Sequence, residues 1–114
     1  MRNVAGNFDV YRATAPALGR VFHAEVDLVP SGNGAAFVVA SLLPASVPLP
    51  SGQTVLSTLN GAELLSLRAG PLASWDVRLP NDARLAGLAI TTQAFLLGGG
   101  PMRLSNAMDL EFGR

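Results

Sequence analysis

Apolar and polar residues alternate along several stretches of the chain, which is the pattern of β-strands that bury one face. In the clearest stretch, Phe22, Ala24, Val26 and Leu28 alternate with the polar residues between them. The same alternation recurs at Trp75, Val77 and Leu79, at Met108, Leu110 and Phe112, and at Phe8 and Val10, which Tyr11 and Arg12 follow. We therefore predict three strands of ordinary length and a short first strand near residue 9.

Two further segments, residues 35–43 and 88–97, carry apolar residues on both faces. Such runs are typical of central strands that are covered on both faces. A short apolar run also fits a buried helix, so the pattern by itself leaves that alternative open.

Turn-forming residues separate these segments and favour strands throughout. We expect residues 30–34 to form a hairpin loop, Asn60-Gly61 to join strands at 55–59 and 62–67, and 98–101 to form another break. Pro44, Pro48 and Pro50 predict an irregular or extended connection, and residues 81–85 have room for one helical turn capped by Asn81 or Asp82. The sequence predicts an all-β, antiparallel sandwich of about eight or nine short strands. We divide it into an N-terminal strand and linker, residues 1–18, and a sandwich domain, residues 19–114.

Composition narrows the functional classes. The chain has 114 residues, eight basic and eight acidic side chains and no Lys, so its formal net charge is zero. This balance argues against a nucleic-acid partner, because such domains carry an excess of basic groups. The chain has no Cys, which excludes disulfides and thiolate chemistry, and no apolar run approaches the length of a membrane-spanning helix. Nor does the N-terminus carry the apolar run of a signal peptide.

Candidate catalytic and metal-binding groups are few. His23, Glu25 and Asp27 share one strand face, where they could hold a divalent metal or form an acid–base pair, but a solvated strand face explains them better. Asp76 and Asp82, with Asn81, could offer oxygens to calcium, although a capped turn accounts for them equally well. No nucleophile motif is present. We therefore predict a protein that is not an enzyme and has no catalytic residue, metal site or cofactor.

Trp75 and Tyr11 are the only residues of their kinds. A sugar-binding sandwich displays such rings as stacking platforms, so these two would form the ligand site of a carbohydrate-binding module. Because Trp75 shares the apolar register of Val77 and Leu79, a place in the core is the stronger expectation.

The absence of Lys also leaves the predicted strand edges without their usual protection against pairing with other chains. The N-terminal segment, with Val4, Phe8, Val10 and Tyr11, could add as a strand to a neighbouring copy. The alternative is that this segment folds back as an edge strand of its own sheet. We expect a homo-oligomer or polymer.

The second half of the chain resembles the β-rich modules found at the C-termini of large secreted proteins of planctomycete and myxobacterial type. The likeness lies in Leu79-Pro80-Asn81-Asp82, Gly87-Leu88, Gln93-Ala94 and Leu104-Ser105-Asn106-Ala107, with Pro48 to Gly52 ahead of them. It covers residues 19–114 and departs from the modules in lacking Cys. The resemblance implies a small secreted β-sandwich with no assigned activity, in which Gly87 sets backbone geometry and Gln93 places an amide inside the sheet.

Two functions follow as expectations. The first is a non-enzymatic structural module of a cell surface, which self-associates through strand edges and could be the subunit of a fibre. The second is a secreted carbohydrate-binding or adhesion module.

Overall fold

The structure, a computed structural model, describes residues 3, 6–42, 44–57 and 63–113. Within these residues the chain forms nine strands and one 3-10 turn, η1, which confirms the predicted all-β class. The elements are β1 (Tyr11–Ala13), β2 (Val21–Asp27), β3 (Ala35–Ser41), β4 (Pro44–Pro48), β5 (Thr54–Ser57), β6 (Glu63–Ala69), β7 (Leu72–Arg78), η1 (Ala83–Leu85), β8 (Ala89–Leu97) and β9 (Arg103–Glu111).

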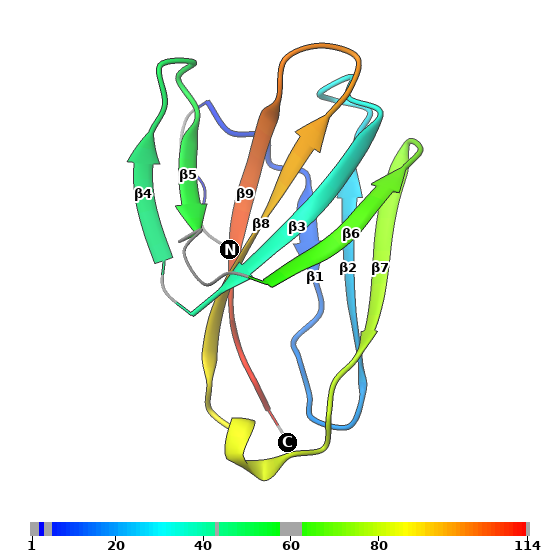
Figure 1. Cartoon of the computed structure of the whole chain (residues 1–114), viewed down its shortest axis with the longest axis vertical. Helices are drawn as coiled ribbons and strands as arrows, with labels where there is room; N and C mark the ends of the chain where they lie inside the picture. The colour runs from blue at the N-terminus through cyan, green and yellow to red at the C-terminus, as the bar shows by residue number, and fades with distance from the viewer. Residues whose placement is uncertain (1–2, 4–5, 43, 58–62, 114) are drawn as a thin grey trace.

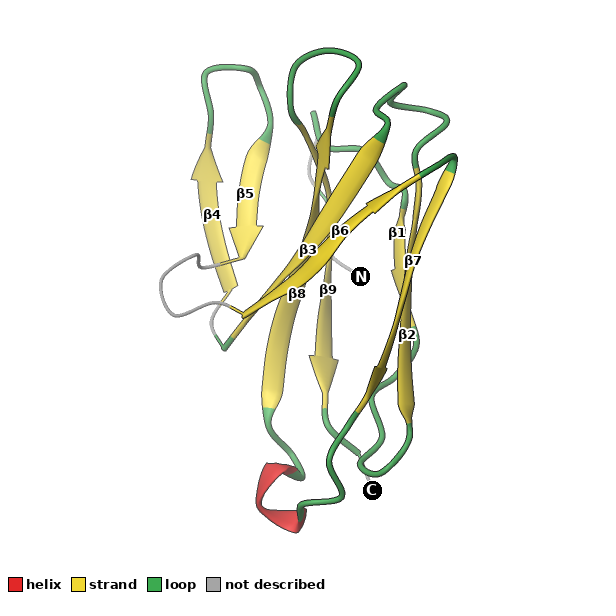
Figure 2. Cartoon of the chain, turned by 45° about the vertical axis from the view of Figure 1, so that its right-hand side comes forward, coloured by secondary structure: helices red, strands yellow, loops and turns green. Residues whose placement is uncertain are grey.

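Two antiparallel sheets face one another, as Figure 1 shows. One has the strand order β1-β2-β7 and the other the order β6-β3-β8-β9. Strands β4 and β5 form a separate two-stranded ribbon that stands beside the four-stranded sheet (Figure 2). The result is a sandwich-like fold with a partial third layer.

The main core lies between the two sheets. The alternating residues of β2 point into it as predicted: Phe22, Ala24 and Val26 are buried, together with Leu28 just beyond the strand. A second cluster covers the opposite face of the four-stranded sheet, where Val55 of the ribbon packs against Val39, Phe95 and Leu104. This second cluster explains why β3 and β8 are apolar on both faces, and both strands occupy the central positions that their composition predicts.

The connection at residues 30–34 is not the predicted hairpin. Strand β2 pairs with β1 and β7, whereas β3 pairs with β6 and β8, so the loop crosses from one sheet to the other. Alternation reveals a strand but not the strand it pairs with. Two strands with a turn between them can form a hairpin in one sheet or belong to two different sheets. The break at residues 98–101 does join paired neighbours, β8 and β9.

Prolines did not prevent pairing at residues 44–48. This segment forms β4, which pairs only with β5, so it lies outside the two main sheets as its prolines require. The Asn60-Gly61 turn lies outside the described residues. The predicted hairpin between the strands that flank it is wrong, because β5 pairs with β4 and β6 pairs with β3, in different sheets.

The short helical turn occurs where it was predicted. Asp82 caps η1, since its carboxylate accepts a hydrogen bond from the backbone N–H of Arg84 at 3.0 Å. Gly87 follows with φ of +82°, a backbone conformation that suits glycine. No helix in the described part of the chain has the length and apolar character to cross a membrane.

Candidate functional site

The two flanks of the sandwich differ in how the sheet edges are finished. On one flank β1 and β9 are the edge strands, and on the other β6 and β7 are. We call these the closed flank and the open flank.

Residues of the N-terminal segment cover the edge of β9. The N–H of Phe8 donates to Leu104 at 2.9 Å, and the N–H of Asn106 donates to the carbonyl of Phe8 at 2.8 Å. The Asn7 amide adds a hydrogen bond to the carbonyl of Ser105 at 3.1 Å. Farther along, the N–H of Gly113 donates to Pro16 at 2.8 Å. The N-terminal residues therefore occupy the outer edge of β9 at residues 104–106, and a second contact follows just beyond the strand.

Asn106 joins the two edge strands of the closed flank. Its Oδ1 accepts from the N–H groups of Val10 and Tyr11 at 3.0 and 2.9 Å, and its Nδ2 donates to the carbonyl of Tyr11 at 2.9 Å. The side chain is fully buried. One amide therefore supplies the main-chain groups of β1 with both donor and acceptor, as a neighbouring strand would.

The remaining edges are protected in other ways. Strand β4 begins and ends with proline, which has no N–H to offer to a ladder. Strand β7 exposes Ser74, Asp76 and Arg78 along its outer face, and charged side chains oppose the addition of another strand.

Strand β6 differs from all of these. It has seven residues without proline or lysine, and none of the described strands pairs with its outer side. Leu64 is 65% exposed and Leu67 is 58% exposed. Only Arg68 is charged among the residues between Leu64 and Ala69. A long strand edge with exposed leucines is a site for pairing with another chain.

The exposed leucine of β6 lies on the outer face of the four-stranded sheet. Leu64 is opposite Val39, which belongs to the cluster beneath the β4–β5 ribbon, whereas its neighbour Leu65 is opposite Val38 in the main core. Residues directly opposite one another in a ladder share a face. Leu67 stands in the bulge where the β3–β6 register shifts. The ribbon covers the β8–β9 half of this face and leaves the β6 half exposed (Figure 2).

A hydrogen bond joins β7 to β6. Trp75 Nε1 donates to the carbonyl of Ser66, and both residues lie in the middle of their strands, between the connection of β6 to β7 and the opposite end. Away from that connection the two strands diverge (Figure 1). An apolar cavity of about 450 Å³ lies between the sheets there, and its lining includes Val38, Leu65 and Val77.

The structure buries both aromatic residues proposed for sugar binding. Tyr11 is 0% exposed and Trp75 is 3% exposed. The Tyr11 hydroxyl donates to Thr92 Oγ1 at 2.8 Å, and burial raises its pKa to about 12 even though that hydrogen bond acts in the opposite direction. Across the described residues, no aromatic side chain is classed as exposed. Neither Tyr11 nor Trp75 therefore lies at a surface where a sugar could stack.

The N-terminal residues proposed for assembly lie mostly within the fold. Val10 and Tyr11 belong to the main core, and Phe8 packs against it. Val4 lies outside the described residues. Strand β1 begins at Tyr11, two residues later than the predicted centre of the first strand, and pairs with β2 of its own sheet. Exchange of this segment between copies stays a prediction.

His23 forms a surface cluster with two carboxylates. Its Nδ1 lies 2.7 Å from Asp76 Oδ1, across the β2–β7 pair, and its Nε2 lies 3.3 Å from Glu25 Oε2. The hydrogen bond to Asp76, followed by that to Glu25, raises the pKa of His23. Asp27 instead accepts a hydrogen bond from the N–H of Val29. Over the described chain, no three histidines or carboxylates are arranged to hold a metal ion.

Asp76 and Asp82 do not converge on a shared site. Asp76 contacts His23, whereas Asp82 binds the guanidinium of Arg84 at 2.8 Å and caps η1. The hydrogen bonds from the side chain and then the backbone of Arg84 lower the pKa of Asp82. Each acidic side chain thus has a local structural partner.

The strand predicted at residues 62–67 overlaps β6, but neither its exposed outer edge nor the cavity was predicted. The residues of β6, Glu-Leu-Leu-Ser-Leu-Arg-Ala, do not alternate, because the register shift places an extra residue in the strand. A run of three leucines around one serine was the available signal. The cavity depends on how far two sheets diverge, for which no local pattern exists.

Comparisons with protein-family models, with curated proteins and with solved structures found no match.

Proposed function

We propose that this domain is a non-enzymatic structural module of an extracellular surface, and that it binds a second copy of itself through the outer edge of β6. The observation that carries the proposal is the contrast among the edges. Proline, charge, shortness or N-terminal residues protect the others, whereas β6 is long, exposes Leu64 and Leu67, and pairs on its inner side with β3 but with no described strand on its outer side. The extracellular setting rests on the resemblance alone.

Pairing of β6 with its counterpart would be antiparallel about a twofold axis. Such an interface is isologous, so it closes after two subunits and forms a dimer. It would join two four-stranded sheets into one continuous sheet. Leu64 and Leu67 would then approach their counterparts on the outer face, where cross-strand apolar pairs stabilise a ladder.

Charge does not oppose this association. The net charge is zero, so two copies do not repel one another at long range. A dimer is favoured over a fibre because a fibre needs a second, different contact surface on each copy. Proline in β4 and charged side chains on β7 oppose a second contact of this kind.

Light scattering across a concentration series tests the proposal. The natural chain should show a rise in weight-average mass toward that of a dimer. The double variant Leu64→Lys/Leu67→Lys should remain a monomer over the same range, because edge lysines oppose strand addition. Val29→Lys provides the matched control, since Val29 is 70% exposed in the loop after β2. A monomeric natural chain, or a dimer that survives the double variant, would contradict the proposal.

A further inference from the structure

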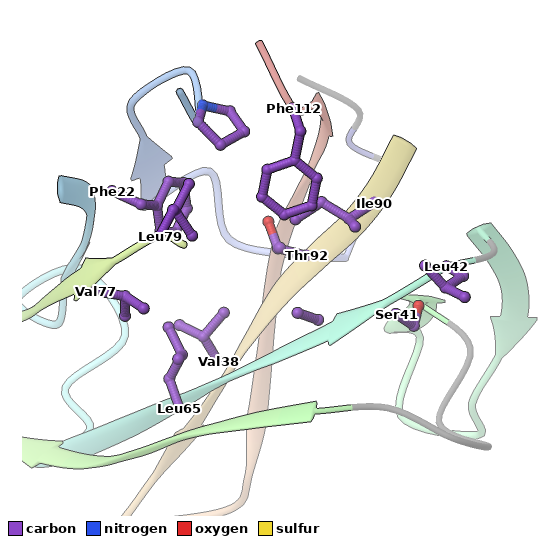
Figure 3. Close-up of a pocket in the computed structure, with 12 residues that line it drawn as sticks. Phe22, Val38, Ser41, Leu42, Leu65, Val77, Leu79, Ile90, Thr92 and Phe112 are labelled. Carbon is purple, nitrogen blue, oxygen red and sulfur yellow. The ribbon is translucent and has the colours of Figure 1, made fainter. Parts of the chain in front are cut away.

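The cavity between the sheets has the features of a ligand site. It lies where the sheets diverge and is lined by side chains from both of them, including Phe22, Val38, Leu65, Val77, Leu79 and Ile90 (Figure 3). Leu42, which is 64% exposed, also lines it, so the cavity reaches the surface. Its volume of about 450 Å³ lies within the range of about 300–1,000 Å³ that is common for small-molecule sites.

The lining determines what kind of molecule could bind. None of its side chains is charged, and the only side-chain polar atoms in it are the hydroxyls of Thr92 and Ser41. Thr92 Oγ1 already accepts from Tyr11 and donates to the carbonyl of Met108 at 3.1 Å. Ser41 also has a partner. The cavity therefore offers no free polar group among these residues that would hold a water molecule or recognise a polar substituent.

The cavity opens to the surface as a cleft whose walls are mainly apolar. Ligand sites are commonly clefts of this kind, and apolar cavities bind apolar guests. The aromatic rings of Phe22 and Phe112 and the aliphatic side chains provide dispersion contacts without directional requirements. Recognition would depend on shape and on the exclusion of charge.

We infer that this cavity binds an uncharged hydrocarbon group, either a linear alkyl chain or a branched isoprenoid chain. The inference is independent of the proposed dimer. Val38 and Leu65 face the cavity, whereas their neighbours Val39 and Leu64 face the opposite side of the sheet. A ligand in the cavity and a second copy on the outer face would therefore use different side chains.

The uncharged fluorescent probe N-phenyl-1-naphthylamine, added to the full chain, tests the inference. The probe should bind with saturation, and a competitor should displace it. Displacement by 1-dodecanol identifies a linear chain as the preferred guest, and displacement by farnesol identifies a branched one; either outcome supports the inference. An absence of saturable binding would overturn it.

Two variants locate the binding site. Ala40 lines the cavity, and Ala40→Phe should fill it, weaken probe binding by at least about tenfold and leave the fold intact or more stable. Ala89→Phe is the matched control because Ala89 is exposed and does not line the cavity. If Ala40→Phe fails to fold, Leu42→Asp places a charge at the mouth and should also weaken binding.

The dimer variant separates the two proposals. Leu64→Lys/Leu67→Lys should bind the probe like the natural chain, because neither side chain lines the cavity. Loss of probe binding in that variant, or full binding in a folded Ala40→Phe variant and in Leu42→Asp, would place the probe elsewhere and overturn the inference.

Discussion

The two flanks of this sandwich differ in what happens to the unpaired main-chain groups of their edge strands. On the closed flank, buried amides and N-terminal residues bind the free main-chain groups of β1 and β9. On the open flank, a hydrogen bond from Trp75 to Ser66 reaches β6, and Leu64 and Leu67 of that strand are exposed. Edges that are closed by internal hydrogen bonds cannot recruit another chain, whereas an edge left apolar and unpaired can. The difference therefore points to where this domain interacts.

Side-chain amides are repeatedly used in place of strand pairing. Gln93 Oε1 accepts from the N–H of Leu56 at 2.9 Å, and its Nε2 donates to Ser105 at 2.8 Å, which ties β5 to the centre of the sheet. Gln53 Oε1 accepts from the N–H of Leu104 at 2.6 Å. An amide supplies the same donor and acceptor as a peptide group, so it can continue a ladder where the strand register shifts.

Replacing the Asn106 side chain should destabilise the closed flank. Asn106→Ala leaves the N–H groups of Val10 and Tyr11 and one carbonyl buried without partners. We expect a loss of about 3–5 kcal/mol in the free energy of unfolding, measured by urea denaturation. Asn3→Ala is the control, since Asn3 is exposed, and it should change stability by less than about 0.5 kcal/mol. Similar stabilities for the two variants would show that Asn106 does not hold the flank closed.

Tyr11 reports on the same flank through its ionisation. Because the chain has one tyrosine, the absorbance of the phenolate follows Tyr11 alone. In the folded protein its pKa is raised to about 12, against 10.0 when unperturbed. Its stabilising contribution is thus complete below pH 10 and is lost as the pH rises toward 12, by about 3 kcal/mol in all. Titration of the native chain near pH 10, as in concentrated urea, would mean that β1 does not stay packed.

The smallest expected effect on stability comes from protonation of His23, which lies on the outer face of the three-stranded sheet. Its pKa is raised by Asp76 and Glu25, so the protonated ring adds stability that is present below pH 6.5 and lost as the pH rises through the raised pKa. Because the ring is 39% exposed, we expect less than about 1 kcal/mol. His23→Gln should match the natural chain above that range and be slightly less stable below it in urea denaturation. An equal difference at every pH would assign the effect to packing.

The sequence correctly indicated strands wherever one face of the strand is buried and the other is exposed to solvent. Phe22 and Val26 show this in β2, and the segments that are apolar on both faces correctly indicated the central strands β3 and β8. The sequence did not reveal which strands share a sheet, because the loop at residues 30–34 could join two paired strands or cross from one sheet to the other. Pairing depends on contacts between residues far apart in the chain.

The candidate site was harder to predict than the fold. The register of Trp75 correctly indicated a place in the core, whereas no such argument was available for Tyr11, which is also buried. Nothing local marked Asn106 as the residue that closes a flank. The bulge in β6 removed the alternation that would have revealed Leu64 as exposed. Sites made by register shifts and by diverging sheets are properties of the assembled fold.

Hydrogen exchange at two protein concentrations compares the flanks most directly. If β6 is the interface, the amides of residues 63–69 should exchange more slowly in concentrated than in dilute protein, because pairing with a second copy protects them. The amides of β1 and β9 should exchange at the same rate in both. Protection of β6 that does not depend on concentration, or a change confined to β1 and β9, would contradict the account.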